Sequence, residues 1–280
     1  MIRPGPIALL GGGEHLPSCE QIDRRLMTLT GVGRPRVVVI PSAASSRQMP
    51  RTAALARNHW QRLGAASVAF VLAGQSDPRA DEEAIGAADV IVLPGGHPDQ
   101  LMHHLAASSL FDAIYDRWLC GAALSGSSAG AMCMFRWQLR LYPPNPLKLQ
   151  PGLGLLDNFV AAPHFDRFRA RRWVSWAARW LDDVSVLGID ESTGVVGAFD
   201  DLHVLGAGGV VVVDRRVQTE YRSGERVGVE VAHPFLRRAV GARLQQRSIW
   251  ADDTSIARSA LRPEGSPFVS SGLAQPSRTT

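Results

Sequence analysis

The chain has 280 residues, 45% of them apolar and 20% charged, which is enough to build the core of one ordinary domain. Its net charge is +4, but the basic residues are spread along the chain without interleaved aromatics, so we expect no nucleic-acid partner. The first residues hold only the short apolar run IALL, too short for a signal peptide or a membrane span. The three cysteines form no C-x-x-C pair and cannot all be bridged within one chain, which favours a reducing compartment. Together with the short apolar run, this predicts a cytoplasmic protein without a membrane partner.

Short apolar runs alternate with longer amphipathic stretches through the first half of the chain. The runs that predict strands are Pro6–Leu10, Arg36–Pro41, Ser67–Leu72, Ala88–Leu93, Ala122–Ser125, Val186–Ile189, Val195–Phe199 and His203–Val213. The stretches that predict helices are Glu20–Leu29, Arg51–Leu63, Gln100–Arg117, Ala129–Trp137 and Arg167–Trp180. This alternation predicts an α/β fold with a mostly parallel central sheet flanked by helices. The closely spaced later strands predict a small antiparallel extension.

The composition changes near Leu236. A basic stretch there leads into a segment rich in serine, proline and threonine. We therefore expect residues 1–235 to form one domain and residues 236–280 a basic C-terminal extension. About the last 20 residues of that extension are expected to be disordered.

Three loops rich in small residues follow expected strands, with the sequences GGGEHL at 11–16, PGGHPDQ at 94–100 and SGSSAG at 125–130. In open α/β sheets, ligands bind beyond the carboxyl ends of the strands. Because the carboxyl ends of parallel strands meet at one edge, we expect these loops to converge on one site.

The last of these loops contains GSSAG, which fits the G-x-S-x-G pattern of a nucleophile on a sharp strand-to-helix turn. Small neighbours let such a turn form, and the backbone N–H that follows the serine faces the reacting oxygen. Ser128 takes the central position, Ala129 would supply the N–H, and Ser127 is the rival nucleophile. A tight turn or a phosphate-binding loop is the structural alternative.

A serine at its ordinary pKa needs a base. Among the eight histidines, His164 stands out because it ends a short apolar run just before an arginine-rich stretch. His15 and His97 lie in the glycine loops, where they could contact a substrate. From these patterns alone, the acid that would orient the base stays open among Asp157, Asp166, Asp182, Asp183, Asp190 and Glu191.

Six segments together resemble peptidase family S51, which includes aspartyl dipeptidase (peptidase E) and cyanophycinase. In chain order they are GGGEHL, IPSAAS, DVIVLPGGHPDQL, GSSAGAM, GLGLLDNFVAAPHFDR and LGIDESTGVV. The resemblance spans roughly residues 6–215. It implies a flavodoxin-like fold related to class I glutamine amidotransferases, and it makes residues 1–235 an S51 peptidase-like catalytic domain.

The family works through a Ser-His-Glu triad, so the resemblance implies Ser128 as nucleophile, His164 as base and Glu191 as acid. It also implies an oxyanion hole made of the backbone N–H groups of Gly96 and Ala129. The implied substrate is a small peptide with an aspartyl or isoaspartyl residue. The side chains expected to bind it are those of Gln100, Arg167, Arg169 and Arg172.

The sequence departs from the cyanophycinase pattern around the histidine. Ala162 and Pro163 precede His164 where cyanophycinase typically carries Asp-Gln, and the arginines that follow fall one residue early. The inserted pair His97-Pro98 disturbs the match at Gln100. Cleavage of aspartyl dipeptides and cleavage of a β-Asp-Arg polymer therefore both remain open. A homodimer is a separate possibility that the sequence leaves open.

Three other interpretations compete with a peptidase. An amidotransferase-like enzyme is disfavoured because the elbow residue is a serine, and an α/β-hydrolase esterase because its triad usually runs serine, acid, histidine. A ligand-binding pseudoenzyme would keep the pocket without turnover. The glycine loops lack nucleotide-binding contexts and no cluster has metal-ligand spacing, so we expect no cofactor and no metal.

Overall fold

The computed structural model describes residues 4–72, 77–106, 108–140, 148–167, 184–198, 201–214 and 217–228, together with Val174, Ala178 and Leu181. The expected C-terminal extension and most of the expected helix Arg167–Trp180 lie outside these residues. The expected domain boundary at residue 235 lies outside them as well. The helix, the boundary and the extension therefore stay predictions.

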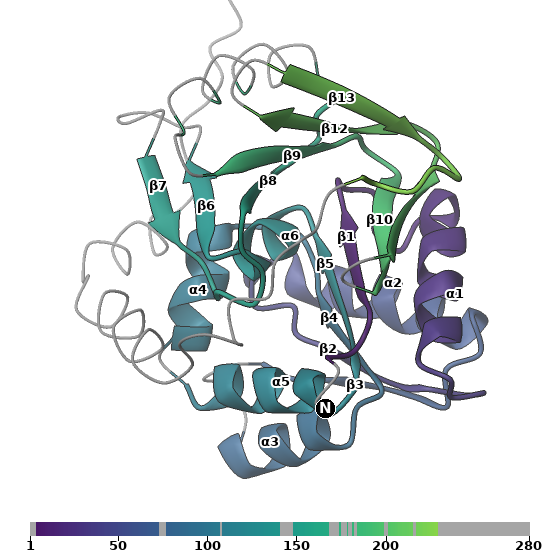
Figure 1. The fold of residues 1–280 in the computed structure, drawn as a ribbon. Helices are drawn as coiled ribbons and strands as arrows, with labels where there is room; N and C mark the ends of the chain where they lie inside the picture. Colours follow the sequence, from purple (N-terminus) through teal and green to yellow (C-terminus); the bar gives the residue numbers. More distant parts are fainter. Residues whose placement is uncertain are drawn as a thin grey trace, which may run out of the picture.

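The main sheet consists of β1 (Ile7–Leu10), β2 (Arg36–Val39), β3 (Ser67–Phe70), β4 (Val90–Leu93), β5 (Ala123–Ser127), β10 (Thr193–Ala198) and β11 (Asp201–Gly206). Their order across the sheet is β11-β10-β1-β5-β4-β2-β3 (Figure 1). The strands from β1 to β3 in this order pair in parallel, whereas β10 and β11 pair antiparallel at one edge. The predicted α/β fold with a mostly parallel sheet is confirmed.

Helices cover both faces of this sheet, and its central strands are apolar on both sides; β1, β4 and β5 are buried at every position. In β1, the side chains of Ala8 and Leu10 join the core under α1 (Glu20–Leu29) and α2 (Met49–Arg62). Ile7 and Leu9 point the other way, as alternation along a strand requires. They join the core that contains α3 (Pro78–Gly86), α4 (Pro98–Ala106), α5 (Leu110–Leu119) and α6 (Ala129–Met134).

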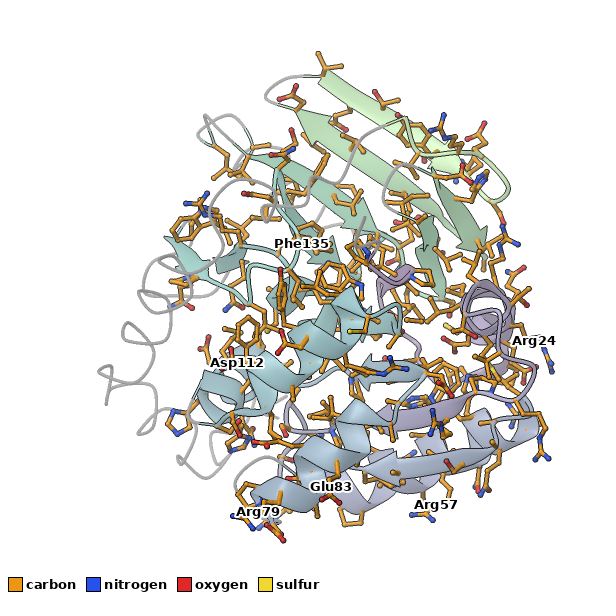
Figure 2. The ribbon with its side chains drawn as sticks, turned by 60° about the horizontal axis from the view of Figure 1, so that its bottom comes forward. Arg24, Arg57, Arg79, Glu83, Asp112 and Phe135 are labelled. Carbon is orange, nitrogen blue, oxygen red and sulfur yellow. The ribbon has the colours of Figure 1, made fainter. Side chains whose placement is uncertain are left out.

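Figure 2 shows that charged side chains lie on the outer surface of the helical layers, among them Arg24 on α1, Arg57 on α2 and Glu83 on α3. Phe135, directly after α6, is fully buried. In the part of the chain that the structure describes, no helix has both the length and the apolar composition needed to cross a membrane.

A second sheet holds β8 (Phe159–Pro163), β9 (Ser185–Ile189), β12 (Gly209–Asp214) and β13 (Val217–Arg222) in the order β13-β12-β9-β8. It lies beside α6 and the end of the main sheet, at the top of Figure 1. Leu187, Ile189 and Val210 on its inner face share the core that contains α6. Because β8 and β9 pair in parallel, their carboxyl ends lie at the same edge. A separate hairpin joins β6 (Trp137–Arg140) and β7 (Lys148–Pro151).

The largest departure from the predicted elements is the division of the later strands between two sheets. The expected single strand His203–Val213 is two strands, β11 in the main sheet and β12 in the second. The chain bends between them after Gly206, whose φ of 123° suits glycine. An apolar run alone does not reveal such a bend. The predicted antiparallel extension is therefore divided as well: β10 and β11 extend the main sheet, whereas β12 pairs antiparallel with β9 and β13 in the second sheet.

Two expected helices are shorter than predicted. Gln100–Arg117 is divided into α4 and α5, and the Ser108 hydroxyl donates to the carbonyl oxygen of Leu105 after α4, a bond that competes with continued helix. The helix from Ala129 ends at Met134, because Phe135 is extended and bridges to Leu156.

Two buried histidines lie beside the loop that follows β1. The Nε2 atom of His59 lies 2.7 Å from Oδ2 of Asp23, and both side chains are buried. The ring of His15 lies 5.5 Å from that of His59, centre to centre. Burial lowers the pKa of His15 from 6.5 to about 4, although the nearby Glu14 carboxylate opposes this shift. The folded protein therefore holds His15 neutral over a range in which an exposed histidine is charged.

This burial makes the stability of the fold depend on pH. Because the pKa of His15 is lower in the folded chain, the unfolded chain binds more protons between about pH 6.5 and pH 4. The contribution of His15 is fully present above about pH 6.5 and is lost as the pH falls toward 4. Urea denaturation of the wild type should show a free energy of unfolding that decreases as the pH is lowered from about 6.5 to 4. His15→Gln should make this dependence on pH less steep.

His203→Gln is the matched control, because it makes the same substitution at a partly exposed histidine and removes no buried imidazole. Its slope should be steeper than that of His15→Gln. Equal slopes for the wild type and His15→Gln would contradict the assignment.

Candidate active site

The chain turns sharply from β5 into α6 at Ser128, which has φ 47° and ψ −110°. Its backbone N–H donates to the carbonyl oxygen of Leu10 at the end of β1, at 3.0 Å. Small residues flank the turn because the space is filled: a Cβ atom on Gly130 would lie 1.9 Å from the carbonyl oxygen of Leu93. A Cβ atom on Gly126 would lie 2.6 Å from the sulfur of Met134. The backbone therefore adopts the strained elbow that GSSAG predicts.

Three side chains form a hydrogen-bonded row at this turn. The Oγ atom of Ser128 lies 3.0 Å from Nε2 of His164, and Nδ1 of His164 lies 3.2 Å from Oε2 of Glu191. His164 directly follows β8, and Glu191 lies two residues beyond β9, so the parallel pair β8–β9 carries both to the serine turn. The order hydroxyl, imidazole and carboxylate allows the ring to accept the serine proton while the carboxylate fixes its orientation.

The loop after β1 supports the histidine directly. The N–H of His164 donates to the carbonyl oxygen of Gly11 at 2.9 Å, and His164 itself has a φ of 52°. A Cβ atom on Gly12 would lie 2.3 Å from Cε1 of the His164 ring, so only glycine leaves room for the imidazole. Gly11 and Gly12 of GGGEHL thus fix the backbone and the ring of His164.

The other described acids that the sequence left open have partners other than the His164 ring. Oδ2 of Asp190 accepts from the N–H of Gly209 at 2.8 Å, which ties it to the start of β12. The carboxylate of Asp157 pairs with Arg136 at 3.5 Å. Oδ1 of Asp166 accepts from the backbone N–H of Glu191 at 3.1 Å and so holds the loop of Glu191 in place. Asp182 and Asp183 lie outside the described residues.

The rival serine has a different partner. The hydroxyl of Ser127 donates to Oε2 of Glu14 at 2.8 Å, and Ser127 is buried. Glu14 was not among the expected site residues, because the acids considered from the sequence all followed Ser128. Its position in GGGEHL, one of the three converging loops, was the available signal.

The backbone of the loop after β4 leaves one N–H directed to no acceptor among the described residues. Gly95 donates to Oε1 of Glu14 and His97 donates to the carbonyl oxygen of Ala43, both at 2.8 Å, but Gly96 has no such bond. Its φ of 142° requires glycine, and a Cβ atom there would lie 2.1 Å from the carbonyl oxygen of Ala43. Ala129 is the first residue of α6, so its N–H has no acceptor within the helix.

Most of the chain, including the residues of this site, matches a known family. The family model described as "Peptidase family S51" matches residues 7–205, which contain the serine turn, His164 and Glu191. The chain belongs to peptidase family S51. As a member of that family it is a serine-type peptidase, which confirms the resemblance of the six segments.

Individual relatives agree with this assignment. A cyanophycinase of Synechococcus elongatus is 30% identical over 224 residues, covering 76% of this chain and 69% of that protein. The crystal structure of a peptidase from an acI-B1 Actinobacterium matches with a TM-score of 0.69 and 28% identity, over 81% of this chain and 98% of that one. A putative peptidase E from Listeria monocytogenes EGD-e shares the fold, with a TM-score of 0.57 at 14% identity over 73% of this chain and 100% of that one.

Two of the expected substrate-binding side chains of this S51 peptidase have contacts within the protein. Nε2 of Gln100 donates to the carbonyl oxygen of Ala44 at 3.3 Å. The guanidinium of Arg167 donates to Oε2 of Glu191 at 3.3 Å, and its side chain is 64% exposed. Arg169 and Arg172 lie outside the described residues. Among the described residues, no cluster of histidine, cysteine, aspartate or glutamate side chains is suited to a metal ion.

No buried cysteine of this S51 peptidase is suited to act as a nucleophile. Cys133 is buried on α6, and burial raises the pKa of its thiol. Burial also raises the pKa of the Cys19 thiol to about 12. Both thiols therefore stay protonated and unreactive near neutral pH, whereas Cys120 is exposed.

Thiol alkylation tests this distribution. Iodoacetamide at a mildly alkaline pH should modify Cys120 and leave peptidase activity unchanged, and Cys120→Ser should remove the labelling seen by mass spectrometry. Activity that declines in step with alkylation of Cys133 would contradict a serine mechanism.

Proposed function

We propose that this S51 peptidase hydrolyses short peptides at aspartyl or isoaspartyl residues, with Ser128 as nucleophile. The observation that carries the proposal is the hydrogen-bonded row from Ser128 through His164 to Glu191. The N–H of Gly96, which has no acceptor among the described residues, lies in the loop that packs against the same turn. The proposed nucleophile, base, orienting acid and oxyanion donor would thus come from loops that meet at one edge.

In the proposed reaction, Oγ of Ser128 attacks the carbonyl carbon of the scissile amide while Nε2 of His164 takes the hydroxyl proton. Negative charge develops on the carbonyl oxygen, where the N–H groups of Gly96 and Ala129 would stabilise it. His164 then donates its proton to the leaving nitrogen as the C–N bond breaks, which leaves an acyl-enzyme on Ser128. Water, deprotonated by His164, hydrolyses this ester and restores the hydroxyl. Glu191 stabilises the imidazolium during both acylation and deacylation.

Two considerations support an acidic substrate. The first is that the relatives at 30% identity are cyanophycinases. The second is that the site offers a cation, which an aspartyl carboxylate needs for binding. Arg167 carries such a cation beside the triad, and a guanidinium has five N–H donors, so its contact with Glu191 leaves others for a substrate carboxylate. Arg169 and Arg172 belong to the same proposal on sequence grounds, and Gln100 would keep its amide oxygen as an acceptor.

The second candidate is an exopeptidase that cleaves β-Asp-Arg polymer as a cyanophycinase does. The similarity to cyanophycinases favours it. Ala162 and Pro163 before the histidine disfavour it, because they replace the polar pair typical of that branch. A different amide hydrolase and a ligand-binding pseudoenzyme are the remaining alternatives.

A panel of substrates separates these candidates. Amine release should be measured from Asp-Leu, Asp-Ala, β-Asp-Arg, Ala-Leu and cyanophycin with the wild type and Ser128→Ala. Ser128→Ala should fold normally and lose about 10⁴-fold or more in kcat, because no other nucleophile reaches the carbonyl carbon. Cleavage of the α-aspartyl dipeptides alone would favour a dipeptidase, and cleavage of β-Asp-Arg or cyanophycin the second candidate. Full turnover by Ser128→Ala would contradict both.

The assignment of the acid can be tested with neighbouring residues as controls. Glu191→Gln should lower kcat by about 10²–10⁴-fold, less than Ser128→Ala, because the imidazole loses the charge that orients it. Asp190→Asn is the matched control one residue away and should stay close to wild type, since an amide oxygen can still accept from Gly209. A wild-type rate for Glu191→Gln together with an inactive Asp157→Asn would move the acid to Asp157.

A further inference from the structure

We propose that Glu14 is a positioning residue that fastens the oxyanion loop to the serine turn. The proposal rests on the proposed serine mechanism and adds to it a residue outside the triad. Glu14 lies in the loop after β1, and its carboxylate makes two hydrogen bonds, one to each of the neighbouring loops. It thereby links the three glycine- and serine-rich loops that form the site.

Each carboxylate oxygen of Glu14 has its own partner. Oε1 accepts the backbone N–H of Gly95, and Oε2 accepts the hydroxyl of Ser127, each at 2.8 Å. Gly95 directly precedes Gly96, whose N–H is the proposed oxyanion donor, and Ser127 directly precedes the nucleophile Ser128. One side chain therefore sets the separation between the donor and the attacking oxygen.

The fit around this carboxylate is tight. A Cβ atom on Gly95 would lie 2.8 Å from Oε1 of Glu14 and 3.2 Å from Cβ of Ser128. The backbone of Gly95 therefore lies against both the carboxylate and the serine turn. Glu14 reaches both loops from a third loop, so a side chain one methylene shorter at position 14 would have to give up at least one of its two hydrogen bonds.

The loop that carries Glu14 is itself anchored. The thiol of Cys19 donates to the carbonyl oxygen of Gly13 at 3.1 Å, and the N–H of Ser192 donates to that of Gly12 at 3.1 Å. The carbonyl oxygen of Gly11 accepts from His164. The loop thus holds the base at one end and, through Glu14, the serine turn and the oxyanion loop at the other.

Both partners of Glu14 are neutral, and none of the ion pairs among the described residues includes it. A negative charge close to the oxyanion opposes the charge that develops there. What the site gains from Glu14 is therefore its reach and its two hydrogen bonds. A glutamine of the same length keeps both, because its amide oxygen accepts from Gly95 and its amide nitrogen donates to the Ser127 hydroxyl.

Two substitutions separate reach from charge. Glu14→Gln keeps the length and removes the charge, whereas Glu14→Asp keeps the charge and shortens the side chain by one methylene. The rate of labelling by a fluorophosphonate should be measured for each, because the reaction needs the nucleophile and an oxyanion donor and requires no known substrate. Glu14→Asp and Glu14→Ala should react about 10- to 100-fold more slowly than wild type, and Glu14→Gln within about threefold of it.

Two further readouts exclude a general structural effect. Thermal midpoints should remain near that of the wild type for all three variants. Inhibition by a peptide aldehyde, whose adduct places an oxyanion in the site, should weaken in Glu14→Asp and Glu14→Ala in proportion to their labelling rates. Ser127→Ala, which removes one of the two bonds, should have an intermediate effect that is not additive with Glu14→Ala.

The outcomes that overturn the proposal are distinct. The charge would be what matters if Glu14→Gln labelled as slowly as Glu14→Ala while Glu14→Asp labelled at nearly the wild-type rate. Glu14 would then act as an acid that binds a substrate ammonium group. Equal labelling of the wild type and Glu14→Ala would show that Glu14 fixes nothing at the site. A wild type that does not label at all would remove the serine mechanism, and the positioning role would fall with it.

Discussion

The hydrogen bond from the N–H of Ser128 to the carbonyl oxygen of Leu10 fixes the serine turn to the end of β1. The rest of the site is arranged around that bond. The turn itself is strained, with a positive φ at a residue that has a side chain, and such strain persists only where the surroundings impose it. Here β1 and β4 hold β5 on both sides, so the chain enters the turn from a position that cannot shift.

The second sheet explains how residues distant in sequence reach that turn. His164 and Glu191 follow two strands that pair in parallel, so the two side chains leave the sheet at the same edge. Its inner face packs against α6, the helix that begins directly after Ser128. Packing of one apolar face thus brings His164 and Glu191, the proposed base and acid, to the serine turn, while the loop after β1 limits the position of the imidazole through Gly12.

Much of this arrangement could be predicted from the sequence, because its signals are local. Unbroken apolar runs mark the parallel strands, and GSSAG marks a turn that only small residues allow. The division into two sheets could not be predicted, because the run from His203 to Val213 reads as one strand and its bend depends on where each half finds a partner. The choice between Asp190 and Glu191 is equally non-local, since it depends on the hydrogen bond that the N–H of Gly209 donates to Asp190. Glu14 was missed because its partners lie 81 and 113 residues away in the chain.

In the proposed mechanism, the covalent intermediate forms on Ser128. The most direct measurement is to trap it, by quenching the enzyme in acid during turnover of an activated aspartyl ester and mapping the modified peptide by tandem mass spectrometry. We expect a single acyl group on Ser128, with none on Ser127 or Cys133. An acyl group on either of those residues, or turnover without any covalent adduct, would contradict it.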